Sequence, residues 1–116
     1  MSNAVSITVS ILQQALRNVP VSTEVPQARP RSFVMVAQTA SEGDAFIERP
    51  TMSLTCWGES DAPAYSLALS CLEALQDAAE THPQLSAVSL DTLSRDEWGA
   101  TGASRYMLQL QLTINI

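Results

Sequence analysis

His82 is the single histidine of the chain, so acid–base or nucleophilic chemistry at neutral pH would centre on it. Nucleophilic catalysis needs a serine or cysteine beside a base that a third group holds in place. His82 directly precedes Pro83 and follows a segment of helical periodicity, where an imidazole complements the partial negative charge of a helix C-terminus. We therefore expect a surface residue at a helix end, and a catalytic triad built on His82 is the alternative.

The other residues of chemical interest lack the spacing that a site requires. Cys56 and Cys71 have no CxxC arrangement and no histidine cluster, so we expect buried thiols rather than a disulfide or a zinc site. Asp96–Glu97 and the pair Glu42 and Asp44 are acids of expected loops, where solvation is the ordinary outcome and catalysis or Ca²⁺ binding the alternative. The glycines form no phosphate-binding loop. The sequence therefore predicts no enzyme, no cofactor and no metal site.

Composition indicates one small domain that contacts partners. The chain has 116 residues, of which 46% are hydrophobic and 16% charged, and its net charge is −6. We expect a single domain over residues 1–116. Every basic residue is arginine, which suits planar contacts with carboxylates, although codon composition can also explain it. An acidic chain without a basic run is poorly suited to grip a phosphate backbone.

The first third of the chain predicts a helix and an extended connector. Residues 3–18 fit both a strand and a helical face, and the good helix formers from Leu12 onward favour a helix that ends before Pro20. Residues 19–31 contain three prolines and read as a connector that can include a short strand at Ser22–Val25.

The rest of the chain predicts two hairpins and a second helix. The fold class is therefore α+β, in the order α-β-β-α-β-β: a four-stranded, mainly antiparallel sheet from two hairpins, with two helices packed on one face. The first hairpin has a long tip that runs from Ser41 to Pro50. The expected elements are strands at Arg31–Thr39, Thr51–Gly58, Ala87–Ser94 and Arg105–Ile116, and a helix from Ser60 to about Thr81.

Apolar side chains predict the buried face of the second helix and mark both hairpin tips. We expect one stripe of Tyr65, Ala68, Leu69, Leu72, Gln76 and Ala79, widened by Leu67, Cys71, Leu75 and Ala78. Trp57 should face away from Cys56, over the second sheet face or at a subunit contact. Phe46 and Ile47 lie in the first tip and Trp98 in the second, either folded back or anchored to a neighbouring chain.

An ordered set of short phrases resembles the tail terminator (tail-completion) proteins of siphophages and their prophages. The resemblance covers about residues 4–116 and rests on the order of the phrases rather than on any one of them. The phrases are Val21–Pro26, Arg29–Val34, Arg49–Thr51, Cys56–Gly58, Ala64–Ala68 and Arg105–Tyr106.

The resemblance implies a structural role in the virion tail, after assembly in the host cytoplasm. It implies a ring, commonly a hexamer, that caps the tail tube, stops its polymerisation and joins it to the head connector. Its partners would be copies of itself, the tube protein and the connector protein, while DNA passes through without specific binding. We expect the interface residues to be Arg31, Phe46, Ile47, Arg49, Trp98 and Arg105.

Two alternatives stay open at this point. Another component of the head–tail joint, such as a connector or stopper, would keep the same fold. A small enzyme or ligand-binding domain would instead show a concave pocket containing His82 or a perturbed acid.

No apolar stretch approaches about 18 residues, so we expect no membrane span. The start lacks the features of a signal peptide, and residues 2–4 can be an expression remnant.

Overall fold

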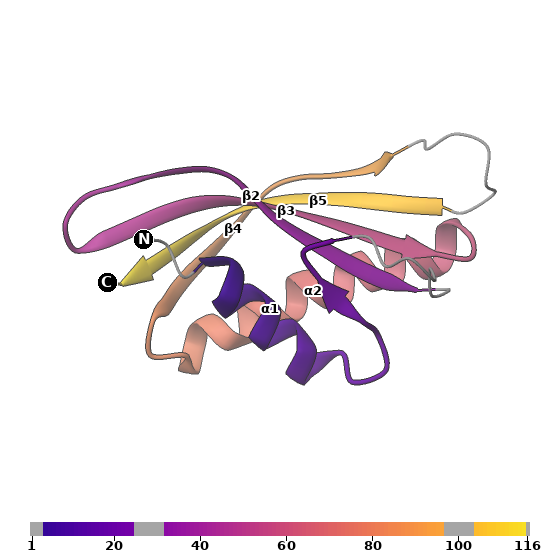
Figure 1. Cartoon of the computed structure of the whole chain (residues 1–116), viewed down its shortest axis with the longest axis horizontal. Helices are drawn as coiled ribbons and strands as arrows, with labels where there is room; N and C mark the ends of the chain where they lie inside the picture. The colour runs from indigo at the N-terminus through magenta and orange to yellow at the C-terminus, as the bar shows by residue number, and fades with distance from the viewer. Residues whose placement is uncertain (1–3, 25–31, 97–103, 116) are drawn as a thin grey trace.

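The strands form one sheet, and both helices lie against the same face of it (Figure 1). The computed structural model describes residues 4–24, 32–96 and 104–115. The sheet has five strands in the order β1-β2-β3-β5-β4. The elements are α1 (Ala4–Ala15), β1 (Val21–Ser22), β2 (Phe33–Gly43), β3 (Ile47–Gly58), α2 (Asp61–Thr81), β4 (Leu85–Asp96) and β5 (Ser104–Asn115).

The predicted four-stranded antiparallel sheet is wrong, because the connector after α1 supplies a fifth strand and makes the sheet mixed. β1 pairs in parallel with β2, with Val21 opposite Val34 and Ser22 opposite Met35. The Val34 amide also donates to the Pro20 carbonyl at 2.9 Å. Proline has no N–H to donate but keeps its carbonyl, so Pro20 can still accept a bond from β2. The β2–β3 and β4–β5 pairs are antiparallel, and β3 and β5 join the two hairpins.

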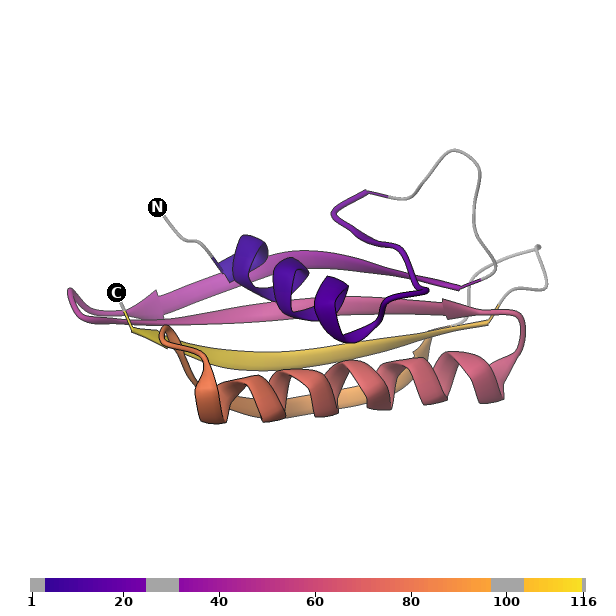
Figure 2. The same ribbon diagram turned by 90° about the horizontal axis from the view of Figure 1, so that it is seen from below.

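The first hairpin is longer than its sequence suggests. We expected a loop from Ser41 to Pro50, but β2 continues to Gly43 and β3 begins at Ile47. Pro50 lies inside β3, and the pairs with β5 run over residues 47–48 and 51–58, which skips the proline. A bulge between Gln38 and Ala40 shifts the register on the β2 side. The hairpin therefore accommodates the proline and projects as a long arm (Figures 1 and 2).

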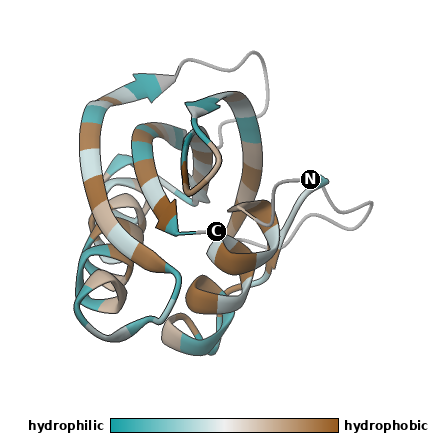
Figure 3. Ribbon diagram, turned by 90° about the vertical axis from the view of Figure 1, so that its left-hand side faces the viewer, coloured by the Kyte–Doolittle hydropathy of each residue, from teal (hydrophilic) through white to brown (hydrophobic). Residues whose placement is uncertain are grey.

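The core lies between the sheet and the two helices. Apolar and polar residues alternate along the strands, as the bands of Figure 3 show. In β5 every second residue from Leu108 to Ile114 is buried, as the period-two pattern predicts. α1 lies over the β2 side of the sheet and α2 over the β4 and β5 side (Figure 2). The largest fully buried apolar side chains include Leu12, Met52, Leu54, Leu75, Leu85, Leu108, Leu110 and Leu112.

The buried stripe of α2 is rotated from the predicted one. Tyr65 and Leu69 belong to the predicted stripe, but they are 43% and 41% exposed. The buried residues are Ala64, Leu67, Ala68, Cys71 and Leu75. Alanines at two of these positions let the helix backbone approach the sheet closely, whereas a large side chain there would hold the layers apart. Neither described helix combines the length and apolar character that a membrane crossing requires.

Candidate functional site

The tip of the β2–β3 hairpin is a tight turn built on Asp44. Its Oδ1 accepts hydrogen bonds from the amides of Phe46 and Ile47, at 2.9 and 3.1 Å, and its own amide donates to the Ile47 carbonyl at 2.8 Å. Gly43 has φ +137°, and a Cβ at this position would lie 2.2 Å from the Ile47 carbonyl oxygen. Only glycine fits this backbone, so the turn has one defined conformation.

Asp44 holds this turn as a carboxylate. The hydrogen bond from the Phe46 amide, followed by that from Ile47, lowers the pKa of Asp44, and the nearby Arg49 acts in the same direction. A charged carboxylate accepts amide hydrogen bonds more strongly than a neutral carboxyl group does. The tip is therefore fixed at neutral pH.

Phe46 is the most exposed large hydrophobic side chain of the described residues, with 76% of its surface accessible. Ile47 and Arg49 follow it on β3 and are partly buried. A phenylalanine exposed to this extent on a rigid turn presents apolar area that a partner can cover at little entropic cost. The arrangement is suited to protein contact rather than to catalysis.

The opposite end of the sheet carries an aromatic stack. The Phe33 and Trp57 rings are parallel within 13°, with centroids 5.0 Å apart, and the Arg105 guanidinium carbon lies 4.9 Å from the Trp57 centroid. Phe33 and Trp57 are 1% and 2% exposed, on the face away from the helices. Arg105, expected to meet a carboxylate of a partner, here makes a cation–π contact within its own chain.

The structure separates the predicted interface residues into two groups. Phe46, Ile47 and Arg49 lie at the hairpin tip, whereas Arg105 pairs with Trp57 near the far end of β3. Ten residues of strand separate Ile47 from Trp57, which corresponds to roughly 33 Å. Arg31 and Trp98 lie outside the described residues.

The middle of the sheet face between these ends is uncharged and carries neither helix (Figure 1). Side chains alternate between the two faces of a strand, so the residues between the buried leucines of β5 point to this face, as do their partners on β3 and β2. Nearer the tip, Gln111 Nε2 donates to Glu42 Oε1 across β3, at 3.2 Å. We missed this neutral face in the sequence, although the alternating Thr, Ser and Gln residues were its signal. Its central residues are Met35, Ala37, Ser53, Thr55, Met107 and Gln109.

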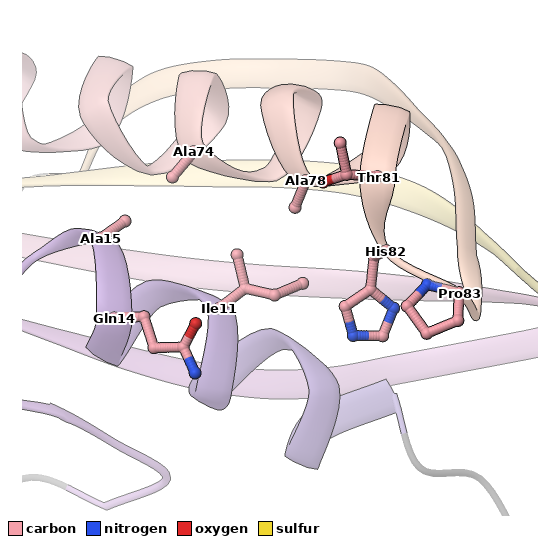
Figure 4. Close-up of a pocket in the computed structure, with 8 residues that line it drawn as sticks. All are labelled: Ile11, Gln14, Ala15, Ala74, Ala78, Thr81, His82 and Pro83. Carbon is pink, nitrogen blue, oxygen red and sulfur yellow. The ribbon is translucent and has the colours of Figure 1, made fainter.

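An open groove separates α1 from α2 on the helix side (Figure 4). Its volume is about 450 Å³, Ile11 of α1 points into it, and His82 and Pro83 close one end. α1 carries no charged residue over its 12 positions, a signal that the sequence analysis did not use. The groove is lined by Ile11, Gln14, Ala15, Ala74, Ala78, Thr81, His82 and Pro83.

His82 holds the turn that follows α2. Its Nδ1 accepts hydrogen bonds from the amides of Gln84 and Leu85, at 3.1 and 3.3 Å, so this nitrogen is already engaged. His82 also lines a second, smaller groove with Ser6 and Ser10. Among the described residues, no carboxylate lines either groove. Within residues 4–24, 32–96 and 104–115, no three His, Cys, Asp or Glu side chains are grouped to hold a metal.

Comparison with known proteins yields a fold likeness. No family model matches the chain. No curated protein matches it either. Among solved structures, the chain is similar to one described as "Virion of native gene transfer agent (GTA) particle", with a TM-score of 0.62 and 14% sequence identity. The match covers 97% of this chain and 87% of that chain. At this identity, the likeness shows a shared fold.

Proposed function

We propose that this protein is a structural component of a virion, of the tail terminator type. In this role it forms a ring, commonly of six copies, that caps the tail tube, stops its polymerisation and joins it to the head connector. The observation that carries the proposal is the fold likeness to a chain of a virion particle, which extends over 97% of the sequence. The ordered phrases of the sequence support it independently.

The shape of the chain suits head-to-tail association. A ring of identical subunits uses two different surfaces of each subunit, one for each neighbour. The hairpin tip with Phe46 and the end with the Trp57 stack lie at opposite ends of β3, on a molecule whose principal extents are 45 × 25 × 24 Å. We propose that the tip with Phe46 is one of these two surfaces; the Phe33–Trp57 stack is buried and marks only the end of the sheet opposite to it.

The charge of the chain suits a ring around DNA. The net charge is −6, the chain has no lysine, and like charges repel the phosphate backbone. Asp96, at the end of β4 opposite Arg105, is one proposed lining residue. Glu97 is the other, and it lies outside the described residues. Replacing both with lysine should increase DNA binding, and unchanged binding would argue against this lining.

A tube-assembly experiment tests the proposal against the neighbouring alternatives. Tube subunits from the same genome are polymerised with and without the purified chain, and tube lengths are measured by negative-stain electron microscopy. A terminator shortens the tubes in proportion to its concentration and binds at one end. A connector or stopper would join the assembly without changing the length of growing tubes.

A ligand-binding or enzymatic role for the His82 grooves is the second candidate. The observation that favours it is the presence of His82 with Ser6 and Ser10 around one groove. Because Nδ1 is engaged with two amides, only Nε2 could serve as the base. Ester hydrolysis that a His82→Gln variant abolishes, with unchanged thermal stability, would support this candidate.

A further inference from the structure

The two cysteines of the chain meet in the core. Cys56 of β3 and Cys71 of α2 are fully buried free thiols, and their Sγ atoms are 3.9 Å apart. The sequence contains only these two cysteines, and they come from different layers of the fold. Their contact joins a central strand of the sheet to the middle of the helix that covers it.

We propose that Cys56 and Cys71 form a latent disulfide site, which a small peroxide oxidises to an internal bond between β3 and α2. A disulfide places the sulfurs about 2.05 Å apart, so they must approach by about 1.9 Å. Rotation of a cysteine about χ1 moves Sγ between staggered positions while the backbone stays in place.

The junction between β3 and α2 keeps the two cysteines aligned. Gly58 packs so closely on the start of α2 that a Cβ there would lie 2.6 Å from the Ala64 amide nitrogen. The helix therefore cannot slide along the strand without disturbing this contact. The 3.9 Å contact between the two Sγ atoms therefore keeps the thiols next to each other in the folded chain.

The oxidation balances with hydrogen peroxide as the two-electron oxidant. The thiolate of one cysteine attacks a peroxide oxygen, the O–O bond breaks, and a sulfenic acid and one water form after protonation. The sulfur of the second cysteine then attacks the sulfenic sulfur, which forms the S–S bond and releases a second water. Two thiols and one peroxide give one disulfide and two waters.

Burial makes this reaction slow and selective for small oxidants. The hydrogen bond with Cys71, followed by burial, raises the pKa of Cys56, so the reactive thiolate is scarce at neutral pH. Full burial also excludes bulky disulfides and alkylating reagents from the folded chain. The thiols should therefore persist in a reducing cytoplasm and oxidise over long exposure outside it. The expectation that the protein leaves the reducing cytoplasm rests on the proposed virion function, whereas the thiol chemistry does not.

The native, reduced protein is incubated with hydrogen peroxide, quenched with catalase, and denatured with iodoacetamide present. We expect the treated protein to run as a single chain on non-reducing gels and to contain no alkylated cysteine. Peptide mapping should show a disulfide between Cys56 and Cys71, and it also measures methionine oxidation as a separate modification. The crosslink should raise the thermal midpoint by about 5 °C or more, reversibly with dithiothreitol. Cys56→Ser and Cys71→Ser are the controls, and neither should show a reversible rise.

Three outcomes would overturn the proposal. They are two alkylatable cysteines after peroxide treatment, disulfides between chains instead of within one, and a crosslink that forms only in urea. The comparison of reduced and oxidised wild-type protein needs no variant, so poor folding of a serine variant leaves the test intact. The result is also independent of assembly: a chain that oxidises as described but does not cap tubes would contradict the terminator proposal and support the disulfide site.

Discussion

Replacement of Phe46 with alanine should weaken self-association and leave the folded chain intact. The side chain is 76% exposed in the single chain, so its removal takes away little that stabilises the fold. The free energy of unfolding should change by no more than about 0.5 kcal/mol, as at ordinary surface positions. In the proposed ring, however, the same side chain is covered by a neighbour.

The size of the association defect follows from the exposed area. A phenylalanine buries about 200 Å², so roughly 150 Å² remains for a partner to cover. At about 25 cal/mol per Å², this area corresponds to an upper limit near 4 kcal/mol. Hot-spot truncations typically cost about 2 kcal/mol or more, which lowers the association constant about 30-fold at each contact.

Sedimentation velocity across a concentration series measures this effect, and thermal unfolding of each variant confirms the fold. Phe46→Leu is the matched control, because it keeps most of the apolar area and should assemble nearly as the wild type does. Leu69→Ala removes a side chain that is 41% exposed on α2, away from the proposed contact, and should also assemble normally. Wild-type assembly by Phe46→Ala would refute the assignment of the tip as an interface.

Three further predictions concern the stability of the fold and its tip. Gly43→Ala places a Cβ against the Ile47 carbonyl at φ +137°, so it should cost about 1–3 kcal/mol in urea unfolding, and an unchanged midpoint would contradict the assigned turn. The pKa of Asp44 is lowered in the folded chain. Its contribution to the stability of the turn is therefore fully present above the unfolded-state pKa and disappears as pH falls through the folded-state pKa. Amide exchange at Phe46 and Ile47 should therefore lose protection only at pH values below the ordinary pKa of aspartate, and an Asp44→Asn variant without this transition is the control. Leu75→Ala, at a fully buried position of α2, should cost about 2–5 kcal/mol in the same urea assay, and a change below 1 kcal/mol would argue against the packing described.

The strongly periodic segments of the sequence predicted their elements well. The alternation from Tyr106 to Ile114 identified β5, and its leucines are buried as expected. The end of α2 at Thr81 also agrees, because His82–Pro83 stops a helix. Patterns of this kind are local, so the sequence records them directly.

Features that depend on distant contacts escaped the sequence analysis. The sequence allowed a short strand at Ser22–Val25, but the strand observed is Val21–Ser22, and its pairing with β2 could not be predicted. Tyr65 looked like core but packs edge-on against Tyr106, at a centroid distance of 5.3 Å, because the smaller Ala64 and Ala68 face the sheet instead. Tertiary packing decided which of two apolar helix faces became buried.

The features of the candidate site likewise divide into those that the sequence predicted and those that depend on distant contacts. Phe46 was correctly placed at a hairpin tip, because Gly43 and Asp44 are local turn signals. The contact of Arg105 with Trp57 could not be read from the sequence, since it depends on the register between β3 and β5.

Negative-stain electron microscopy of the purified chain, alone and mixed with tube subunits of the same genome, tests whether the protein is a ring-forming terminator. We expect annular particles of a single stoichiometry, six copies, with one ring at one end of each tube. A chain that stays monomeric in both samples at every concentration, with tubes that grow past it, would contradict the proposed function.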